Sequence, residues 1–459
     1  MKKIIIILSI FFTINSFSQE HFAGLNTSSR VGIISGSNNP AELMNMSNKF
    51  EASILSTSFN LSNNKIGFSD ILSGKNLETL IFTGSEPVNL RIDGEIYGPS
   101  FALKTKNWAL GITSKATGKL DVVDVDTNLG DAFVNSGLNS VLGSTTVNNN
   151  YNQRLNGTTW GEIGITAATS LLNDVTHKVN VGATFKLLFP GSYSNLGLDK
   201  FNGTITNSAG QVFLNNTTAN LNIAYSGGLA ESFSNFNDYS KSVFGSLNGF
   251  SGDIGINYQW KDAPESNPKK NQNKYKLNAG LSIKNIGSMT FKDDNNFSTN
   301  YILNIQSTID NPQGLNLNQF ENIDNLQQIE TILINEGYLD KVEAEKKDFK
   351  VKLPTTISLY ADVKIIPTFF VTGFLQQKLN DDNANDQITA QNILTITPRF
   401  NTGFFEVFAP FSTSEVSGFN TGIGFRVGGF FIGSSSIVTA LINDSKQADF
   451  YTGFRWAFL

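Results

Sequence analysis

The chain has 459 residues, a formal net charge of −5 at pH 7 and no cysteine. The lack of thiols excludes disulfides, thiolate metal sites and a lipid-anchored cysteine, and an acidic chain without basic clusters does not suggest a nucleic-acid partner. Charged residues make up only 16% of the sequence, whereas glycine (40) and phenylalanine (37) are frequent. A soluble protein of this length usually carries more surface charge.

The first residues have the pattern of a secretory signal peptide. Lys2 and Lys3 precede a short apolar run over residues 4–12, and Ser16–Ser18 places small residues where signal peptidase cuts. The run is too short to cross a bilayer as a helix, which needs about 20 apolar residues, and no later segment approaches that length. We therefore predict export with cleavage before Gln19, the alternative being an uncleaved anchor.

Residues 19–49, which follow the predicted signal peptide 1–18, are polar and are interrupted by Asn39-Pro40-Ala41. Proline fixes its own φ and pushes the preceding residue toward extended backbone, which favours a turn here. We predict that this segment plugs, or lies beneath, the β-barrel that the rest of the sequence indicates. Glu42 follows the turn, and we expect it to anchor the plug to a cation in the lumen.

From residue 50 onward, apolar and polar residues alternate with period two in many runs, as in strands whose side chains point to opposite faces. One run alternates Val179, Val181, Ala183 and Phe185 with Asn180, Gly182, Thr184 and Lys186. The runs are about 10–13 residues long, closer to the about 9–11 of a tilted membrane strand than to the about 5–6 of a soluble one. We therefore predict an all-β fold, a transmembrane antiparallel β-barrel over residues 50–459.

The predicted strands begin near Phe50, Arg91, Trp108, Thr158, Lys178, Phe250, Tyr275, Leu353, Thr368, Thr389, Phe404, Gly418, Gly429 and Gln447. They number about 14, an even count that returns both termini to the periplasmic side. Two further strands, near Thr218 and Phe297, would give about 16 and satisfy the same parity. The longer segments between strands are predicted extracellular loops: 121–156, 190–248 and 288–351, with 61–90, 379–388, 412–417 and 439–446. Short turns such as Lys106-Asn107, Asn173-Asp174 and Asn401-Thr402 are predicted on the periplasmic side.

The segment 288–351 differs in its hydrophobic pattern from the strands around it. Phe320, Ile323, Leu326 and Ile329 recur at roughly helical spacing among polar residues. This pattern predicts one or two short amphipathic helices in a surface loop. We expect no second globular domain, because such a domain needs a core of its own.

The end of the chain is an aromatic-rich amphipathic strand. Phe450, Phe454, Trp456 and Phe458 share one face, as expected of an aromatic girdle. Such a strand is similar to the C-terminal signal by which the barrel-assembly machinery recognises its substrates, although Leu459 and not an aromatic residue stands last. The alternative is the terminal strand of a soluble sheet.

Taken in order, these features resemble a known family. An Asn39-Pro40-Ala41 segment precedes paired long strands, which include GATFKLL at 182–188, GDIGINYQW at 252–260, LSIKNIGSM at 281–289 and a terminal YTGFRWAFL. The chain is similar to the FadL-like barrels, the long-chain fatty acid transporter superfamily, and most resembles an uncharacterised branch of Bacteroidota outer-membrane proteins. The resemblance implies a barrel with an N-terminal plug that carries the Asn-Pro-Ala turn. It also implies passage of hydrophobic molecules, or, as in other members, a fixed subunit of a secretion machinery.

Charged residues lie on the strand faces that the alternation assigns to the lumen. We expect them to pair across the interior and stiffen it, the alternative being a polar pore; their mixed signs argue against strong ion selectivity. They are Arg91, Asp93, Glu95, Glu162, Lys186, Asp253, Lys284, Asp362, Arg426 and Arg455, with Lys261, Lys276 and Lys364 on the same predicted faces.

The sequence contains no pattern that we would assign to catalysis. There is no Gly-x-Ser-x-Gly elbow and no phosphate loop, and His21 and His177, which we expect to be exposed, lack a second ligand at metal-site spacing. We therefore predict a protein that is not an enzyme and needs no metal or cofactor.

Two functions remain open at this point. The first is passive uptake or binding of small hydrophobic molecules in the outer membrane. The second is a structural subunit of an outer-membrane secretion or assembly complex. The expected partners are outer-membrane lipid, the barrel-assembly machinery during insertion, and either a hydrophobic ligand or a membrane-complex partner.

Overall fold

The computed structural model describes residues 21–28, 30–134, 143–208, 210–228, 245–262, 275–292, 296–307 and 312–458. The predicted signal peptide 1–18 and the terminal Leu459 lie outside these residues.

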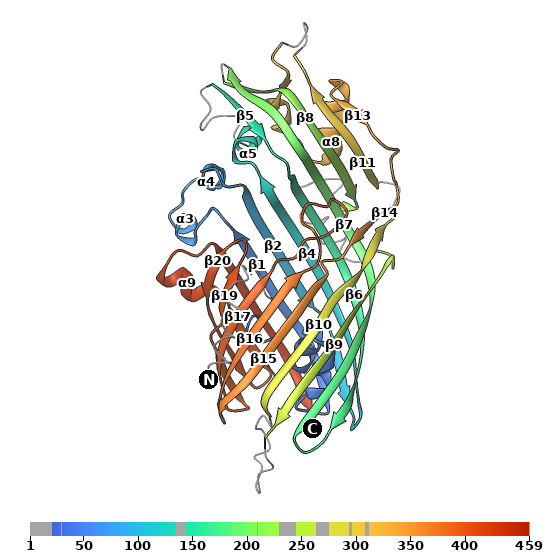
Figure 1. Ribbon diagram of the computed structural model, residues 1–459, viewed down its shortest axis with the longest axis vertical. Coiled ribbons are helices and arrows are strands. Elements are labelled where there is room, and N and C mark those ends of the chain that lie inside the picture. The colour runs from blue at the N-terminus through green and yellow to red at the C-terminus, as the bar shows by residue number, and fades with distance from the viewer. Residues whose placement is uncertain are drawn as a thin grey trace, which may run out of the picture.

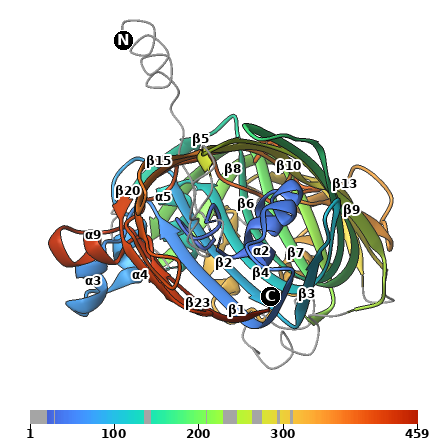
Figure 2. The same ribbon diagram turned by 90° about the horizontal axis from the view of Figure 1, so that it is seen from below.

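Among the residues described, antiparallel strands form a closed ring of 14 strands (Figures 1 and 2). In ring order they are β1 (Phe50–Asn63), β2 (Val88–Tyr97) with β3 (Ser100–Lys104), β4 (Trp108–Val125), β6 (Asn152–Asn173), β7 (His177–Ser208), β9 (Gly249–Lys261), β10 (Tyr275–Phe291), β14 (Phe349–Lys352) with β15 (Thr356–Ile366), β16 (Phe369–Lys378), β17 (Ile393–Asn401), β18 (Phe405–Phe408) with β19 (Phe411–Ser414), β20 (Gly418–Thr421) with β21 (Ile423–Val427), β22 (Phe430–Ser434) and β23 (Gln447–Phe458). The ring closes because β1 pairs with β23.

The predicted count of 14 is therefore confirmed for the ring. Strands also form at the two extra places, as β8 (Gln211–Ser226) and β11 (Phe297–Ile305). They do not enter the ring, because β8 pairs with the second half of β7 and β11 pairs with β8. The alternative of 16 ring strands is thus wrong.

Large apolar side chains point outward all round the ring. Phe185 is 51% exposed, whereas the next residue, Lys186, is 6% exposed and faces the lumen. Burial of apolar surface is favourable by about 25 cal/mol per Å², so an exposed apolar face all round the ring is unfavourable in water and fits contact with lipid. We call it the apolar band; it includes Phe59, Leu110, Ile165, Phe185, Ile254, Leu281, Leu359, Ile396, Phe425 and Phe454.

Lys276 departs from the predicted alternation. The pairing of β10 with β9 shifts register between Tyr275 and Leu277, which is where a bulge turns a side chain to the other face. Lys276 is consequently exposed, with its ammonium 5.1 Å from the centroid of the Trp260 ring on the outer face. Its predicted place in the lumen is wrong.

The last strand, β23, carries the predicted aromatic face. Phe450, Phe454 and Trp456 are exposed on the outside, whereas Tyr451 is buried inside. Phe458, near the end of the chain, pairs with Phe50 at the start of β1, so both lie at the same end of the barrel. We call this the terminal end of the barrel and the opposite one the distal end.

The distal end contains far more regular structure than predicted (Figure 1). The predicted loop 190–248 holds the second half of β7 and all of β8, and the loop 288–351 holds β11, β12 (Leu315–Asn316), η2 (Leu317–Phe320), α8 (Leu326–Asn335) and β13 (Leu339–Lys341). The loop 121–156 holds α5 (Thr127–Val134) and β5 (Ser144–Asn148). These strands lie beyond the apolar band, with one face on a hydrophobic core and the other rich in polar residues, so the sequence lacks the lipid-facing pattern of the ring strands.

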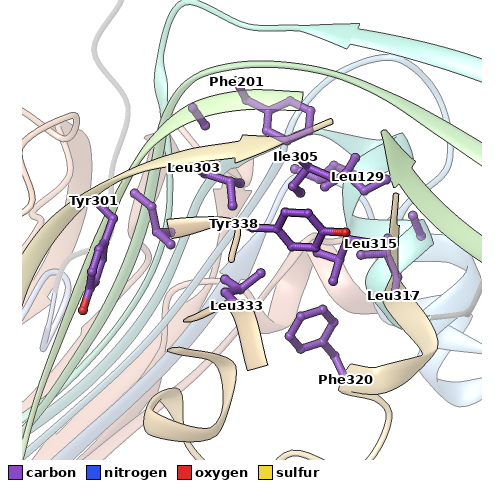
Figure 3. Close-up of a cluster of buried hydrophobic side chains, with 14 of the residues drawn as sticks. Leu129, Phe201, Tyr301, Leu303, Ile305, Leu315, Leu317, Phe320, Leu333 and Tyr338 are labelled. Carbon is purple, nitrogen blue, oxygen red and sulfur yellow. The ribbon is translucent and has the colours of Figure 1, made fainter. Parts of the chain in front are cut away.

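A hydrophobic core fills this distal module, which consists of these elements (Figure 3). Leu129 of α5, Phe201 of β7, Ile305 of β11 and Leu333 of α8 come together in it. The amphipathic helix predicted near residue 326 is present as α8, but a separate core was not expected. No helix in the described part of the chain is long and apolar enough to cross a membrane.

Candidate functional site

Residues 21–49, which we call the plug segment, lie largely inside the ring, with α2 (Gly32–Asn38) and η1 (Pro40–Asn45) against its wall (Figure 2). The start of α2 is held by Glu51 of β1, whose carboxylate accepts hydrogen bonds from Gly32 N (3.2 Å) and Ile33 N (3.0 Å). Arg455 of β23 pairs with the same carboxylate at 2.7 Å. The wall therefore supplies both the acceptor for free helix N–H groups and its counter-charge.

The Asn-Pro-Ala turn rests on glycines of three neighbouring strands. Asn39 Oδ1 accepts from Ala41 N at 3.0 Å, and Asn39 Nδ2 donates to a backbone carbonyl of β9 at 3.0 Å. A Cβ atom on Gly182 would lie 2.6 Å from Ala41 N, and one on Gly255 would lie 2.0 Å from Asn39 Oδ1. Gly280 faces the same turn. These glycines are required because the plug backbone lies where wall side chains would otherwise be.

Among the described residues no cation forms an ion pair with Glu42, and neutral groups take the place of the predicted lumen cation. Its Oε1 accepts from the amides of Asn257 (2.8 Å) and Asn278 (2.9 Å) and from the Tyr360 hydroxyl, and its Oε2 accepts from Asn45 (2.8 Å). Several neutral donors satisfy a buried carboxylate as well as one cation does. Asn45 belongs to η1 itself, and the other three donors come from β9, β10 and β15, which place them level with η1.

A second attachment of the plug segment lies at Glu406. This carboxylate is fully buried between Arg399, 3.0 Å away, and Arg426, 2.7 Å away. The Ser28 hydroxyl of the plug segment donates to it at 2.8 Å, and Arg399 also donates to Gly24 O at 2.7 Å. Three strands of the ring and the plug segment therefore share one charged cluster.

Apart from Lys276, the lumen charges predicted from the alternation lie on the inside of the ring, where Lys115 and Lys119, which were not predicted, join them. Across β2, β4, β6, β7 and β9 they form a belt of alternating sign, in which Lys115 is 2.8 Å from Glu95 and 3.4 Å from Glu162. Asp93 pairs with Lys119, and Lys186 pairs with Asp253 at 2.8 Å. Five other predicted charges form ion pairs: Arg91 with Asp121, Asp362 with Arg399, Arg426 with Glu406, Arg455 with Glu51 and Lys364 with Asp262. The remaining two donate hydrogen bonds to amide oxygens, Lys284 to Asn38 and, at the terminal end, Lys261 to Asn173.

Neither histidine is exposed as predicted. His21 lies in the lumen, where Nε2 is 3.3 Å from Asp93 and Nδ1 is 2.8 Å from Ser58 Oγ. His177 is half-buried, stacks on Tyr258 and shares a hydrogen bond of 2.8 Å with its hydroxyl. No three metal-binding side chains gather in the part of the chain that the structure describes.

His21 makes attachment of the plug segment sensitive to pH. Burial lowers the pKa of His21, but the carboxylates of Glu95 and Asp93 outweigh burial and raise this pKa above its ordinary 6.5. A raised folded-state pKa gives stability that is complete below pH 6.5 and is lost as pH rises through the raised value.

We therefore expect hydrogen-exchange protection factors of residues 22–28 to fall when pH rises from slightly acidic to alkaline. In a His21→Asn variant, the same protection factors are expected to change little over this range. An equal fall in both proteins would show that His21 is not responsible.

A cap loop, residues 379–392, connects β16 to β17 and reaches across the distal mouth of the ring to β6 and β7. Arg154, which is fully buried, donates to Asp382 O (2.8 Å) and Gln387 O (2.9 Å), and Tyr193 donates to Asn385 O (2.8 Å). The sequence predicts 379–388 only as an extracellular loop. Arg154 was missed because it lies in the predicted loop 121–156 and its partners are distant in sequence.

A cavity of about 140 Å³ remains in the lumen between the plug segment and the cap loop. Aromatic rings of Phe22, Tyr97, Trp160 and Phe374 line it together with charges of the belt, and Ala390 and Gln391 come from the cap loop. The indole N–H of Trp160 is buried and has no hydrogen-bond partner among the described residues. Lys284 also lines the cavity, and its ammonium is 3.3 Å from Asn38 Oδ1.

No curated protein matches this chain. The toluene transporter TodX of P. putida superposes with a TM-score of 0.45 at 9% identity, covering 96% of this chain and 99% of that one. The toluene transporter TbuX of Ralstonia pickettii superposes with a TM-score of 0.43 at 10% identity, covering 95% of this chain and 97% of that one. A FadL homologue of Pseudomonas aeruginosa superposes with a TM-score of 0.30 at 9% identity, covering 96% of this chain and 98% of that one.

A family model also matches most of the sequence. It covers residues 40–435, from Pro40 of the plug segment to Ser435, just after the end of β22, and its description is "Family of unknown function (DUF5723)". The chain belongs to this family.

Proposed function

We propose that the protein is an outer-membrane barrel that binds, and passively admits, small hydrophobic molecules carrying a polar group. The observation that carries the proposal is the lumen cavity, whose lining combines aromatic rings with charged groups. Small-molecule sites typically combine apolar walls with a few polar groups that fix orientation. The cavity therefore favours this function over a purely structural subunit.

The size of the cavity limits what it can hold. At about 140 Å³ it is close to the roughly 150 Å³ of an engineered cavity that binds benzene. One ring with a small polar substituent fits this space. The unpaired Trp160 N–H and the Lys284 ammonium offer donors to the polar substituent.

We expect molecules to reach the cavity past the plug segment or the cap loop, which both contribute to its lining. The plug segment lies toward the terminal end and the cap loop toward the distal end, each held by buried hydrogen bonds. We expect passage to be slow and gated, unlike flow through an open pore. The proposed partners are outer-membrane lipid around the apolar band and the barrel-assembly machinery, which would bind β23 during insertion.

Calorimetric titration of the detergent-solubilised full chain with phenol tests the proposal. We expect saturable binding at one site, weakened at least about tenfold, or 1.4 kcal/mol, in an Ala390→Trp variant that fills the cavity. Ala384→Trp is the matched control, because Ala384 lies in the cap loop but does not line the cavity. Lack of saturable binding to the folded wild-type barrel would refute the proposal.

A further inference from the structure

Two connections on one side of the barrel expose the most solvent-accessible large apolar side chains in the described part of the chain. The connection from β1 to β2 carries α3 (Phe68–Leu72) and α4 (Leu77–Ile81), and that from β22 to β23 carries α9 (Ile437–Ile442). Leu72 is 73% exposed, Leu441 78% and Ile442 81%. An apolar cluster of this kind marks a surface that contacts something other than water.

The α3 and α9 helices form one unit, which we call the lateral unit. Ser69 N donates to Asp444 Oδ1 at 2.9 Å, and Phe68 N donates to Ser445 O at 2.8 Å. On the side facing the ring, Thr421 N of β20 donates to Thr439 Oγ1 of α9 at 2.7 Å. The polar contacts of the unit therefore hold it to the barrel and leave its apolar side chains outside.

The lateral unit projects sideways, outside the circumference of the ring (Figure 2). It begins where the apolar band ends: Ile432 is exposed on the outer face of β22, two residues before that strand ends at Ser434. At about 3.3 Å per residue, only about 7 Å of strand separates Ile432 from the end of β22. Phe419, which is also exposed, lies on β20 against which α9 packs.

We propose that the lateral unit lies in the interfacial region of the lipid bilayer and inserts Leu72, Leu441 and Ile442 among the acyl chains. The occupant is lipid because the exposed cluster continues the apolar band, which is itself covered by lipid. Helices that lie in the interface bury their apolar side chains at the boundary between headgroups and acyl chains. Such an anchor fixes the height and tilt of the barrel on the side where its wall is shortest.

Site-directed spin labelling tests the inference directly, because the chain has no cysteine and each variant therefore carries a single label site. Leu441→Cys is compared with Phe454→Cys on the apolar band and with Val342→Cys, which is 60% exposed at the distal module. The labelled full-length proteins are placed in phosphatidylcholine vesicles, and collision with oxygen and with a water-soluble nickel chelate is measured.

We expect the ratio of oxygen to nickel collision at Leu441→Cys to match that of Phe454→Cys and to exceed that of Val342→Cys several-fold. A ratio equal to that of Val342→Cys would place the unit in water and overturn the inference. Spin–spin broadening that disappears on dilution with unlabelled protein would identify a second copy as the occupant and would equally overturn it. Neither result depends on the binding of small molecules in the lumen.

Discussion

Replacing Glu406 with alanine is expected to lower the free energy of unfolding by about 3–5 kcal/mol, because removal of one partner leaves buried charges uncompensated. Glu406 is the carboxylate between Arg399 and Arg426, and all three side chains are at most 1% exposed. The plug segment also loses the acceptor for Ser28. The change therefore affects the ring and its attachment to the plug together.

The midpoint temperature of the shift between folded and heat-denatured bands on a semi-native gel measures this effect. Glu345→Ala is the control, because Glu345 pairs with Lys341 on the surface, with the two side chains 49% and 42% exposed. Such exposed pairs contribute about 0–1 kcal/mol. Equal midpoints for the two variants would show that the Glu406 cluster does not stabilise the barrel.

Replacing Gly182 with alanine is expected to displace the Asn-Pro-Ala turn from the wall and to open a conducting path. The new Cβ atom would lie 2.6 Å from backbone atoms of Pro40 and Ala41, which cannot rotate away as a side chain would. Overpacking of this kind costs about 1–3 kcal/mol when the surroundings adapt. Movement of the plug segment is the adaptation that leaves the ring intact.

Conductance across planar bilayers distinguishes the two states. We expect the wild-type protein to be silent and Gly182→Ala to show stepwise openings. Gly373→Ala is the matched control on another ring strand, since a Cβ at Gly373 meets no atom within 4 Å. A Gly182→Ala protein that inserts into the bilayer and still shows the heat-dependent band shift of a folded barrel, but carries no current, would show that the turn does not close the lumen.

The ring could be predicted from the sequence because lipid outside and polar side chains inside impose strict alternation on each ring strand. Phe185 and Lys186 show that contrast within two residues. The second half of β7 could not be predicted in this way. It passes beyond the apolar band into the distal module, where a hydrophobic core on one side and water on the other give a weaker pattern.

The candidate site could be predicted only in part. The lumen positions of Asp93 and Glu162 follow from alternation, because a charged residue in the middle of a membrane strand is disfavoured on the lipid face. The partners of Glu42 could not be foreseen, since they depend on which strands lie level with η1 in the closed ring. The contacts of Arg154 depend likewise on a loop that folds back into the mouth of the ring.

Heat-modifiability of the full-length protein after cell fractionation tests the central claim most directly. We predict that the protein is released from the membrane fraction only by detergent, and that the unboiled form migrates differently from the boiled form because the closed ring resists the detergent. Recovery of the protein in a soluble fraction, with no difference between boiled and unboiled samples, would contradict a membrane-spanning barrel.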